Sequence, residues 1–188
     1  MKAIVSVIVA AWLQLANAAA DRDAIFNWYK GTEPRNVLYA INCGSDDAVT
    51  DDAGITFEAD RGFSGGQSSL EGYNQRKWPL SNTEVYQSER WHDEDFFYRL
   101  PVDTQIDQKL ALVLKFSEIY FSNAGQKVFD VKIGNQMVKK NLDPLSLAYG
   151  KFLPYDVFVD LRLKGGKLYI DNAEAKGAIK QVQGQNYL

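Results

Sequence analysis

The sequence predicts an all-β protein, an antiparallel β-sandwich or jelly roll. Apolar residues recur with period two far more often than with period 3.6, the alternating runs are short, and clusters of Gly, Asp, Asn and Pro separate them. Many short antiparallel strands joined by regular turns are typical of sandwiches and jelly rolls. A chain of 188 residues with 46% hydrophobic and 24% charged residues fits one folded domain and excludes a wholly disordered chain.

The N-terminus has the pattern of a secretory signal peptide. Lys2 supplies a positive charge, residues 3–15 form an apolar segment, and Ala-Asn-Ala at 16–18 places small residues at the spacing that signal peptidase requires. We therefore predict a cleaved signal peptide over residues 1–18, followed by an N-terminal extension over residues 19–36. The apolar segment is shorter than the ~20 residues that span a bilayer, so we expect no membrane span in the chain.

A central strand is predicted over residues 109–116. Leu110, Leu112, Leu114 and Phe116 fall on one face, and the other face carries Ala111 and Val113, the pattern of a strand buried on both sides. Further strands are predicted over residues 37–43, 55–59, 84–91 and 96–102.

Two hairpins are predicted in the second half of the chain. Gly134-Asn135 separates the alternating runs of residues 127–142, and Gly165-Gly166 separates those of residues 157–170. Both dipeptides tolerate the positive φ that tight hairpin turns require. A helical signal occurs only near residues 21–29, where Asp23 can cap a turn or two.

Charge and residue counts exclude several classes of function. A net charge of −3 without a basic run is unsuited to binding nucleic acid. The single Cys43 cannot form an intrachain disulfide, and we expect it to be a buried small hydrophobe rather than a reactive thiol. One histidine, His92, and an acidic stretch at 46–52 without calcium-loop spacing predict no metal site. We expect no cofactor.

Catalysis is a weaker interpretation than binding. The candidate carboxylates are the Asp-Glu-Asp run at 93–95 and the pair Glu89 and Glu118, and adjacent carboxylates in a turn are usually solvent contacts. Tyr120 and Phe121 follow the central strand and precede turn residues, so at least one of them should face a loop surface. An exposed aromatic beside Asn, Ser and carboxylates suits a sugar, whose C–H face stacks on the ring. A protein-binding sandwich remains the alternative from spacing alone.

Five stretches of the sequence form a recognisable family pattern: VLYAINCGSDD (37–47), GITFEADRGF (54–63), VYQSERW (85–91), LVLKFSEIYFSNAGQKVFDVKIGNQMV (112–138) and KNLDP (140–144). Together they resemble the malectin family, over about residues 37–167. That resemblance implies a jelly-roll-like, galactose-binding-like sandwich and a noncatalytic lectin of the endoplasmic reticulum lumen, which binds glucosylated high-mannose N-glycans through a terminal diglucose unit. Implied partners are such glycans and proteins of glycoprotein quality control. A receptor-type protein-interaction sandwich and, less favoured, a glycoside hydrolase are the alternatives.

The resemblance also implies the residues of a glucose pocket: Tyr73, Trp91, Tyr120 and Phe121. Trp91 departs from the family pattern, in which Tyr is usual, and a Trp lacks the phenolic hydroxyl. The family also uses an aspartate near the end of the domain. Asp171 looks similar to it but ends a hairpin rather than following a further strand, so it is not counted among the predicted site residues.

The end of the chain differs from the family pattern. In the family the segment after the last hairpin continues into another strand, whereas here the chain stops after residues 181–188. We therefore expect the domain over residues 37–188 to be truncated, as in a spliced product or partial gene model, with a natural short variant as the alternative. The last residues form no retention signal, so how the protein stays in the endoplasmic reticulum is left open.

Overall fold

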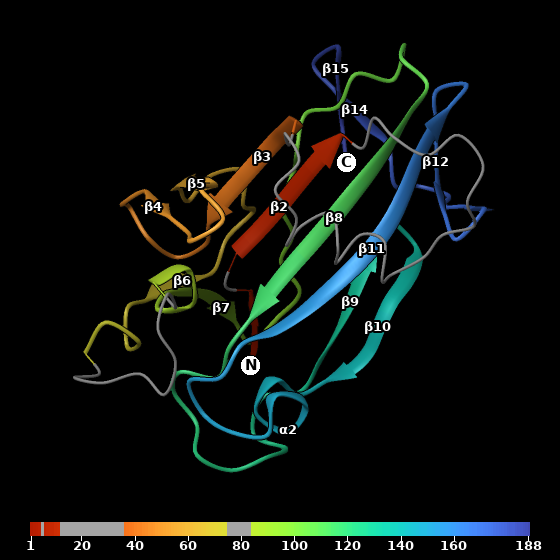
Figure 1. Cartoon of the computed structure of the whole chain (residues 1–188). Coiled ribbons are helices and arrows are strands. Elements are labelled where there is room, and N and C mark those ends of the chain that lie inside the picture. The colour runs from red at the N-terminus through yellow and green to blue at the C-terminus, as the bar shows by residue number, and fades with distance from the viewer. Residues whose placement is uncertain (5, 12–35, 75–83) are drawn as a thin grey trace.

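The computed structural model describes residues 1–4, 6–11, 36–74 and 84–188. These residues are nearly all β, and one large twisted sheet runs through the molecule (Figure 1). This sheet has eight strands, and its neighbours are antiparallel except for one parallel pair, β3 and β5. In order across the sheet the strands are β13 (Ala173–Glu174), β12 (Lys167–Ile170), β11 (Tyr155–Lys164), β8 (Gln108–Phe116), β2 (Ser6–Ala11), β3 (Asn36–Asn42), β5 (Thr56–Ala59) and β4 (Val49–Thr50).

Smaller sheets flank the large one. The largest of them orders β1 (Lys2–Ile4), β7 (Glu89–His92) and β6 (Gln67–Ser69). A two-stranded ribbon of β9 (Phe129–Ile133) and β10 (Gln136–Leu142) packs against one face of the large sheet, as Figure 1 shows. A second ribbon pairs β14 (Lys180–Val182) with β15 (Gln185–Tyr187). The all-β sandwich that the sequence predicts is therefore confirmed.

Strand β8 is the central strand that the alternating pattern predicts. Leu110, Leu112, Leu114 and Phe116 are buried in the main core together with Phe129 of the β9–β10 ribbon. Val113 is buried on the opposite face, in a second core cluster. Full burial of each such side chain contributes about 1.5–3 kcal/mol, so a strand with two apolar faces belongs inside the sheet.

Both predicted hairpins form with the expected two-residue turns. Ile133 pairs with Gln136 across Gly134-Asn135, and Lys164 pairs with Lys167 across Gly165-Gly166. Gly165 and Gly166 have φ angles of 56° and 75°, in the left-handed region that favours glycine. The turn residues therefore set the register of both hairpins.

Three local predictions differ from the structure. The segment 84–91 begins as a 3-10 turn, η1 (Glu84–Tyr86), before β7. The segment 96–102 makes only isolated bridges at Tyr98 and Pro101 instead of a strand. A short helix, α2 (Pro144–Ala148), was not predicted, although Asp143 caps it by accepting from the N–H of Ser146 at 3.2 Å.

The predicted helical segment at 21–29 lies outside the described residues. Part of the predicted signal peptide is described, because residues 6–11 form β2 and pair with β3 on one side and β8 on the other. The structure is that of the uncleaved chain, so removal of residues 1–18 stays a prediction. None of the helices within the described ranges combines the length and apolar character that crossing a bilayer requires. Cys43 is fully buried, as predicted.

Candidate functional site

Two of the four predicted site residues line one cavity. Trp91 lies on β7, opposite Gln67 of β6, and Tyr120 lies in the loop that follows β8. The cavity has a volume of about 470 Å³, enough for a sugar of one or two rings. Its lining residues are Met1, Gln67, Ser68, Ser69, Leu70, Glu71, Asn74, Trp91 and Tyr120.

Tyr120 and Phe121 sit on a tight turn at the end of β8. The backbone N–H groups of both residues donate to Oε1 of Glu118, at 2.7 and 2.8 Å. Their rings meet edge to face, with centroids 5.0 Å apart. Tyr120 is 56% exposed while Phe121 is half-buried, so the prediction that at least one of them faces a loop surface is confirmed.

The adjacent loop holds this turn from outside. The ammonium group of Lys151 donates to the backbone carbonyl of Tyr120 at 2.7 Å, and the N–H of Phe152 donates to the carbonyl of Glu118 at 3.0 Å. The two aromatic residues therefore stand on a backbone that is hydrogen-bonded from both sides.

Tyr73 lies beside the cavity rather than in its wall. It is 44% exposed in a turn whose N–H at Tyr73 donates to the carbonyl of Leu70 at 3.0 Å. The preceding Gly72 packs tightly on the chain before β7, since a Cβ there would lie 2.4 Å from the carbonyl oxygen of Gln87. Only glycine allows this close approach, which places the turn that carries Tyr73 against the chain before β7, beside the cavity.

The polar wall of the cavity is the part that the sequence did not predict. Strand β6 contributes Gln67, Ser68 and Ser69, and the turn after it contributes Glu71 and Asn74, whose side chains lie 3.5 Å apart. These groups offer both donors and acceptors, which hydroxyl groups of a ligand require. The polar run QSSLEGYN before and around Tyr73 is the signal that could have indicated them.

A buried network fixes the strand below the cavity. Arg90 follows Glu89 on β7, and its Nε donates to Asp60 at 2.5 Å. Asp60 also accepts from the N–H of Gly44 at 2.7 Å and from the hydroxyl of Tyr98 at 3.0 Å. Burial raises the pKa of the Tyr98 hydroxyl well above its ordinary value, so Tyr98 stays a neutral donor. Strand β7, which carries Trp91, is therefore held rigidly.

The other chemical candidates lie elsewhere or are enclosed. The Asp-Glu-Asp run at 93–95 is exposed, and the N–H of Glu94 donates to Nδ1 of His92 at 2.8 Å. Asp171 sits in the turn between β12 and β13 with a positive φ of 49°, and it does not line the cavity. Within the described residues, no group of three or more His, Cys, Asp and Glu side chains could hold a metal ion.

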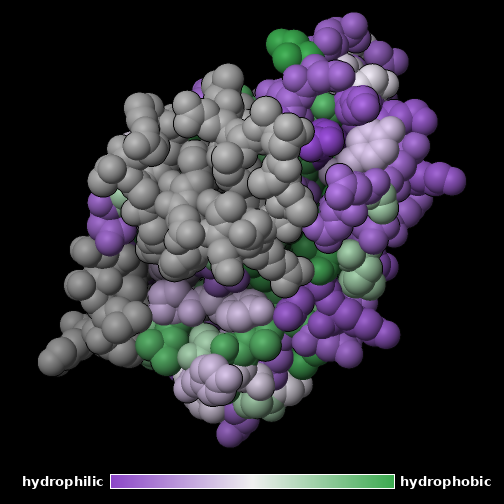
Figure 2. Space-filling model, turned by 45° about the vertical axis from the view of Figure 1, so that its right-hand side comes forward, coloured by the Kyte–Doolittle hydropathy of each residue, from purple (hydrophilic) through white to green (hydrophobic). Residues whose placement is uncertain are grey.

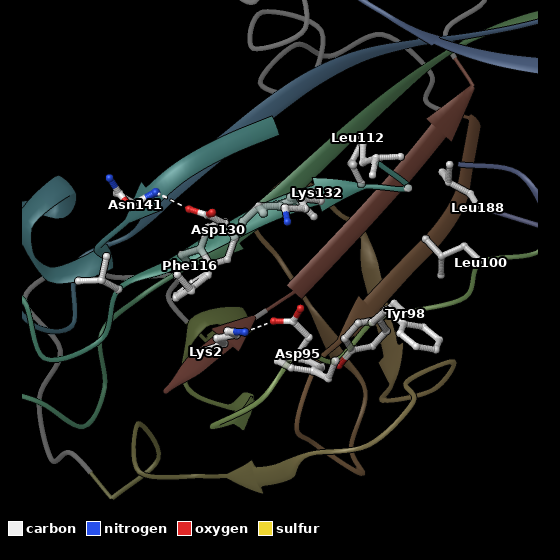
Figure 3. A pocket seen from close by; sticks show the side chains of 18 residues that line it. Lys2, Asp95, Tyr98, Leu100, Leu112, Phe116, Asp130, Lys132, Asn141 and Leu188 are labelled. Carbon is white, nitrogen blue, oxygen red and sulfur yellow. Dashed lines mark hydrogen bonds and ion pairs between the residues drawn. The ribbon is translucent and has the colours of Figure 1, made fainter. Parts of the chain in front are cut away.

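A larger cavity, of about 650 Å³, lies between β8 and the β9–β10 ribbon. Figure 3 shows Leu112 and Phe116 along it, with the Lys2–Asp95 ion pair on one side and Asp130 and Lys132 on another. None of the four predicted site residues lines it. This cavity lies between the layers of the sandwich, whereas the cavity that contains Trp91 and Tyr120 is the candidate site.

The surface changes character along the molecule. In Figure 2, apart from the atoms drawn in grey, hydrophilic residues cover the side of the hairpins, and apolar and weakly polar residues gather at the lower end. Figure 1 places α2 and the segment after β8 at that end. Tyr120 belongs to that segment, and Tyr149, which follows α2, is 94% exposed. Exposed aromatic rings thus occur on both loops at this end.

The chain is similar in sequence to known proteins of one family. Residues 37–187 match the family described as the malectin domain. Malectin of Mus musculus is 32% identical over 159 residues, and Malectin of Homo sapiens is 33% identical over 160 residues, each covering 82% of this chain and 51% of the relative. Malectin-A of Xenopus laevis is 34% identical over 139 residues, or 71% of this chain and 48% of the relative. The chain spans about half the length of the curated relatives it matches.

Proposed function

This chain belongs to the malectin family, and we propose that it is a lectin, a protein that binds carbohydrate without chemically changing it. We propose further that its ligand is the terminal diglucose unit of glucosylated high-mannose N-glycans. The place of action in this proposal is glycoprotein quality control in the endoplasmic reticulum.

One observation carries the proposal: Trp91 and Tyr120, from segments far apart in the sequence, line the same cavity as five polar side chains. A sugar ring has an apolar C–H face that stacks on an aromatic ring, and it has hydroxyl groups that need fixed polar partners. The cavity offers both kinds of surface within one enclosure. The polar side chains are Gln67, Ser68, Ser69, Glu71 and Asn74.

The position of the carboxylates supports binding over hydrolysis. Glycosidases need two carboxyl groups that reach the scissile bond from opposite sides. Glu89 and Glu118 are fully buried and both contact the ammonium group of Lys127, so neither is offered to a ligand. Among the described residues, the lining of the candidate site holds a single carboxylate, Glu71, and not the pair that a hydrolase needs.

A glycan array with the full chain tests the proposal. We expect selective binding of glucosylated high-mannose glycans that end in diglucose, with no release of reducing sugar from the bound glycans. Release of reducing sugar would instead support a glycoside hydrolase. An array without any bound glycan would support a protein-interaction sandwich and contradict the proposal.

The cellular part of the proposal has its own test. The predicted signal peptide supports entry into the secretory pathway. We expect the expressed protein to co-fractionate with endoplasmic reticulum markers and to be protected from added protease until the membranes are permeabilised. A protein found wholly outside the secretory compartments would contradict this assignment.

A further inference from the structure

Three charged side chains form a buried cluster directly behind the candidate site. Lys127 donates from Nζ to Oε1 and Oε2 of Glu89, at 2.9 and 2.7 Å, and the same nitrogen lies 3.1 Å from Oε2 of Glu118. All three side chains are at most 1% exposed. Charged residues are almost never fully buried without partners, because removing a charge from water is costly. Packing of apolar side chains does not explain the burial of these three charges, whereas their pairing with one another does.

The cluster reaches the site at two points. Through Glu118 it touches the turn, because Oε1 of this side chain accepts both N–H groups that present Tyr120 and Phe121. Through Glu89 it touches β7 two residues before Trp91. The two segments that supply the aromatic walls of the cavity are thus joined by one ammonium group.

The charge of the Glu118 carboxylate explains why the turn at Tyr120 and Phe121 has a defined geometry. Each carboxylate oxygen of Glu118 has a defined task, since Oε1 accepts from the turn and Oε2 faces Lys127. Hydrogen bonds to ionised acceptors are roughly twice as strong as neutral ones, and the low dielectric of a buried site strengthens them further. The turn therefore has one favoured geometry, and loss of the Glu118 carboxylate releases it.

We propose that Glu118 and Lys127 are positioning residues of the ligand site, and that the Glu89–Lys127–Glu118 cluster fixes Tyr120 and Phe121 relative to Trp91 before a ligand arrives. This inference rests on the proposed function, because it assigns a role within the same site. Neither residue lines the cavity, so their effect on binding is exerted through the turn and not by contact.

The test compares two variants at one position. Glu118→Ala removes both acceptor oxygens, and Glu118→Gln keeps one oxygen for the turn while it loses the charge. We expect affinity for diglucose disaccharides, measured by calorimetry well below each melting temperature, to fall by about tenfold or more for Glu118→Ala and by less for Glu118→Gln. The amide proton resonances of Tyr120 and Phe121 in the ligand-free protein should move upfield in the same order.

A matched control separates positioning from general stability. Lys115 is also buried on β8, and it donates to the hydroxyl of Tyr86 at 2.7 Å and to Asp156 at 3.0 Å, away from the turn. Lys115→Met should lower the melting temperature and leave both the diglucose affinity and the Tyr120 and Phe121 amide resonances close to those of the wild type.

Each outcome decides the question. A folded Glu118→Ala protein that binds diglucose within about twofold of the wild type would overturn the inference, as would a Lys115→Met protein that loses as much affinity as Glu118→Ala. If Glu118→Ala does not fold, Glu118→Gln decides alone, with unchanged affinity and unchanged amide resonances overturning the inference. A wild-type protein that binds no diglucose is a different failure, since it contradicts the proposed function itself.

Discussion

At the scale of single residues, Tyr120 is the side chain whose role is easiest to separate from folding. It is 56% exposed and its backbone is hydrogen-bonded to the side chains of Glu118 and Lys151, so the ring contributes little to the packing of the core. We expect Tyr120→Ala to weaken diglucose binding by about 1 kcal/mol, roughly fivefold, with little change in melting temperature. Titration calorimetry and a thermal melt check both expectations.

Phe121 provides the comparison for that substitution. Its ring is half-buried and lies 5.8 Å from the ammonium nitrogen of Lys127, so Phe121→Ala should cost stability as well as affinity. A large drop in melting temperature for Tyr120→Ala would instead assign Tyr120 to the core and contradict its place in the site.

The place of Trp91 in the site can be tested by its fluorescence. If a sugar stacks on its ring, diglucose should change the tryptophan fluorescence, because the indole moves from water to an apolar contact. Trp91→Phe should abolish that change, whereas Trp78→Phe, at a position outside the described residues, should leave it intact. An emission spectrum that stays the same at saturating ligand would remove Trp91 from the binding site.

Glu89 makes a prediction about pH. Burial raises the pKa of its carboxyl above the ordinary 4.5, and the neighbouring Lys127 lowers it by a smaller amount. The folded state thus holds this proton more tightly than the unfolded state does. The stabilising contribution of Glu89 is fully present below about pH 4.5 and is lost as the pH rises through the higher folded-state pKa.

Urea unfolding of the wild type and of Glu89→Gln at a series of pH values between 4.5 and 7.5 checks this sign. The free energy of unfolding of Glu89→Gln, relative to the wild type, should increase with pH across that range, because the variant has no proton to lose. A difference that is constant with pH would contradict a raised pKa at Glu89.

The residues of the site could be predicted only in part. Trp91, Tyr120 and Phe121 fall in stretches specific enough to carry a family resemblance. The polar residues Ser68 and Asn74 could not be found in the same way, because they have no hydrophobic pattern. Ser68 reaches the cavity through the pairing of β6 with β7, and Asn74 lies in the turn that follows β6. The structural role of Lys127 could not be predicted either, because only the fold brings its two partners, Glu89 and Glu118, together.

At the scale of elements, β2 is a strand of the large sheet that also lies within the predicted signal peptide. It pairs along six residues with β8 and along six with β3, so it closes the large sheet between them. Cleavage after Ala18, as the signal peptide predicts, would remove β2 and leave backbone N–H and C=O groups of β3 and β8 without this partner.

A comparison of residues 19–188 with the full chain tests that consequence. We expect the shorter protein to stay folded but to melt at a lower temperature than the full chain, because β3 and β8 each lose a strand partner. Light scattering and a thermal melt measure it. A 19–188 protein that melts at the same temperature as the full chain would contradict the expectation and would show that β2 is dispensable for stability.

Strands with strong local signals were predictable, and elements that depend on the tertiary structure were not. Strand β8 and the Gly165-Gly166 hairpin carry complete patterns in sequence. The segment 96–102 alternates as well as many strands do, but its two bridges reach different segments, Tyr98 pairing with Phe63 and Pro101 with Tyr187, so no continuous ladder forms. Helix α2 spans only five residues, too few for an apolar period, and its Asp-Pro start was the one usable signal.

At the scale of the whole molecule, the large sheet and the loops have separate tasks. The sheet buries apolar side chains on both faces of β8, and this core fixes where the strand ends. The candidate site lies beyond that end, between the turn at Tyr120 and the small sheet that carries Trp91. A rigid scaffold with functional side chains on its loops is the usual arrangement for binding proteins.

The cavity between Trp91 and Tyr120 is the proposed binding site for diglucose. Isothermal titration calorimetry of the full chain with glucose–glucose disaccharides, next to a mannose–mannose disaccharide and the Tyr120→Ala variant, tests it most directly. We expect saturable binding of one diglucose per chain, weaker or absent binding of the mannose disaccharide, and roughly fivefold weaker diglucose binding by the variant. No heat of binding with any glucose disaccharide, or equal affinity in Tyr120→Ala, would contradict it.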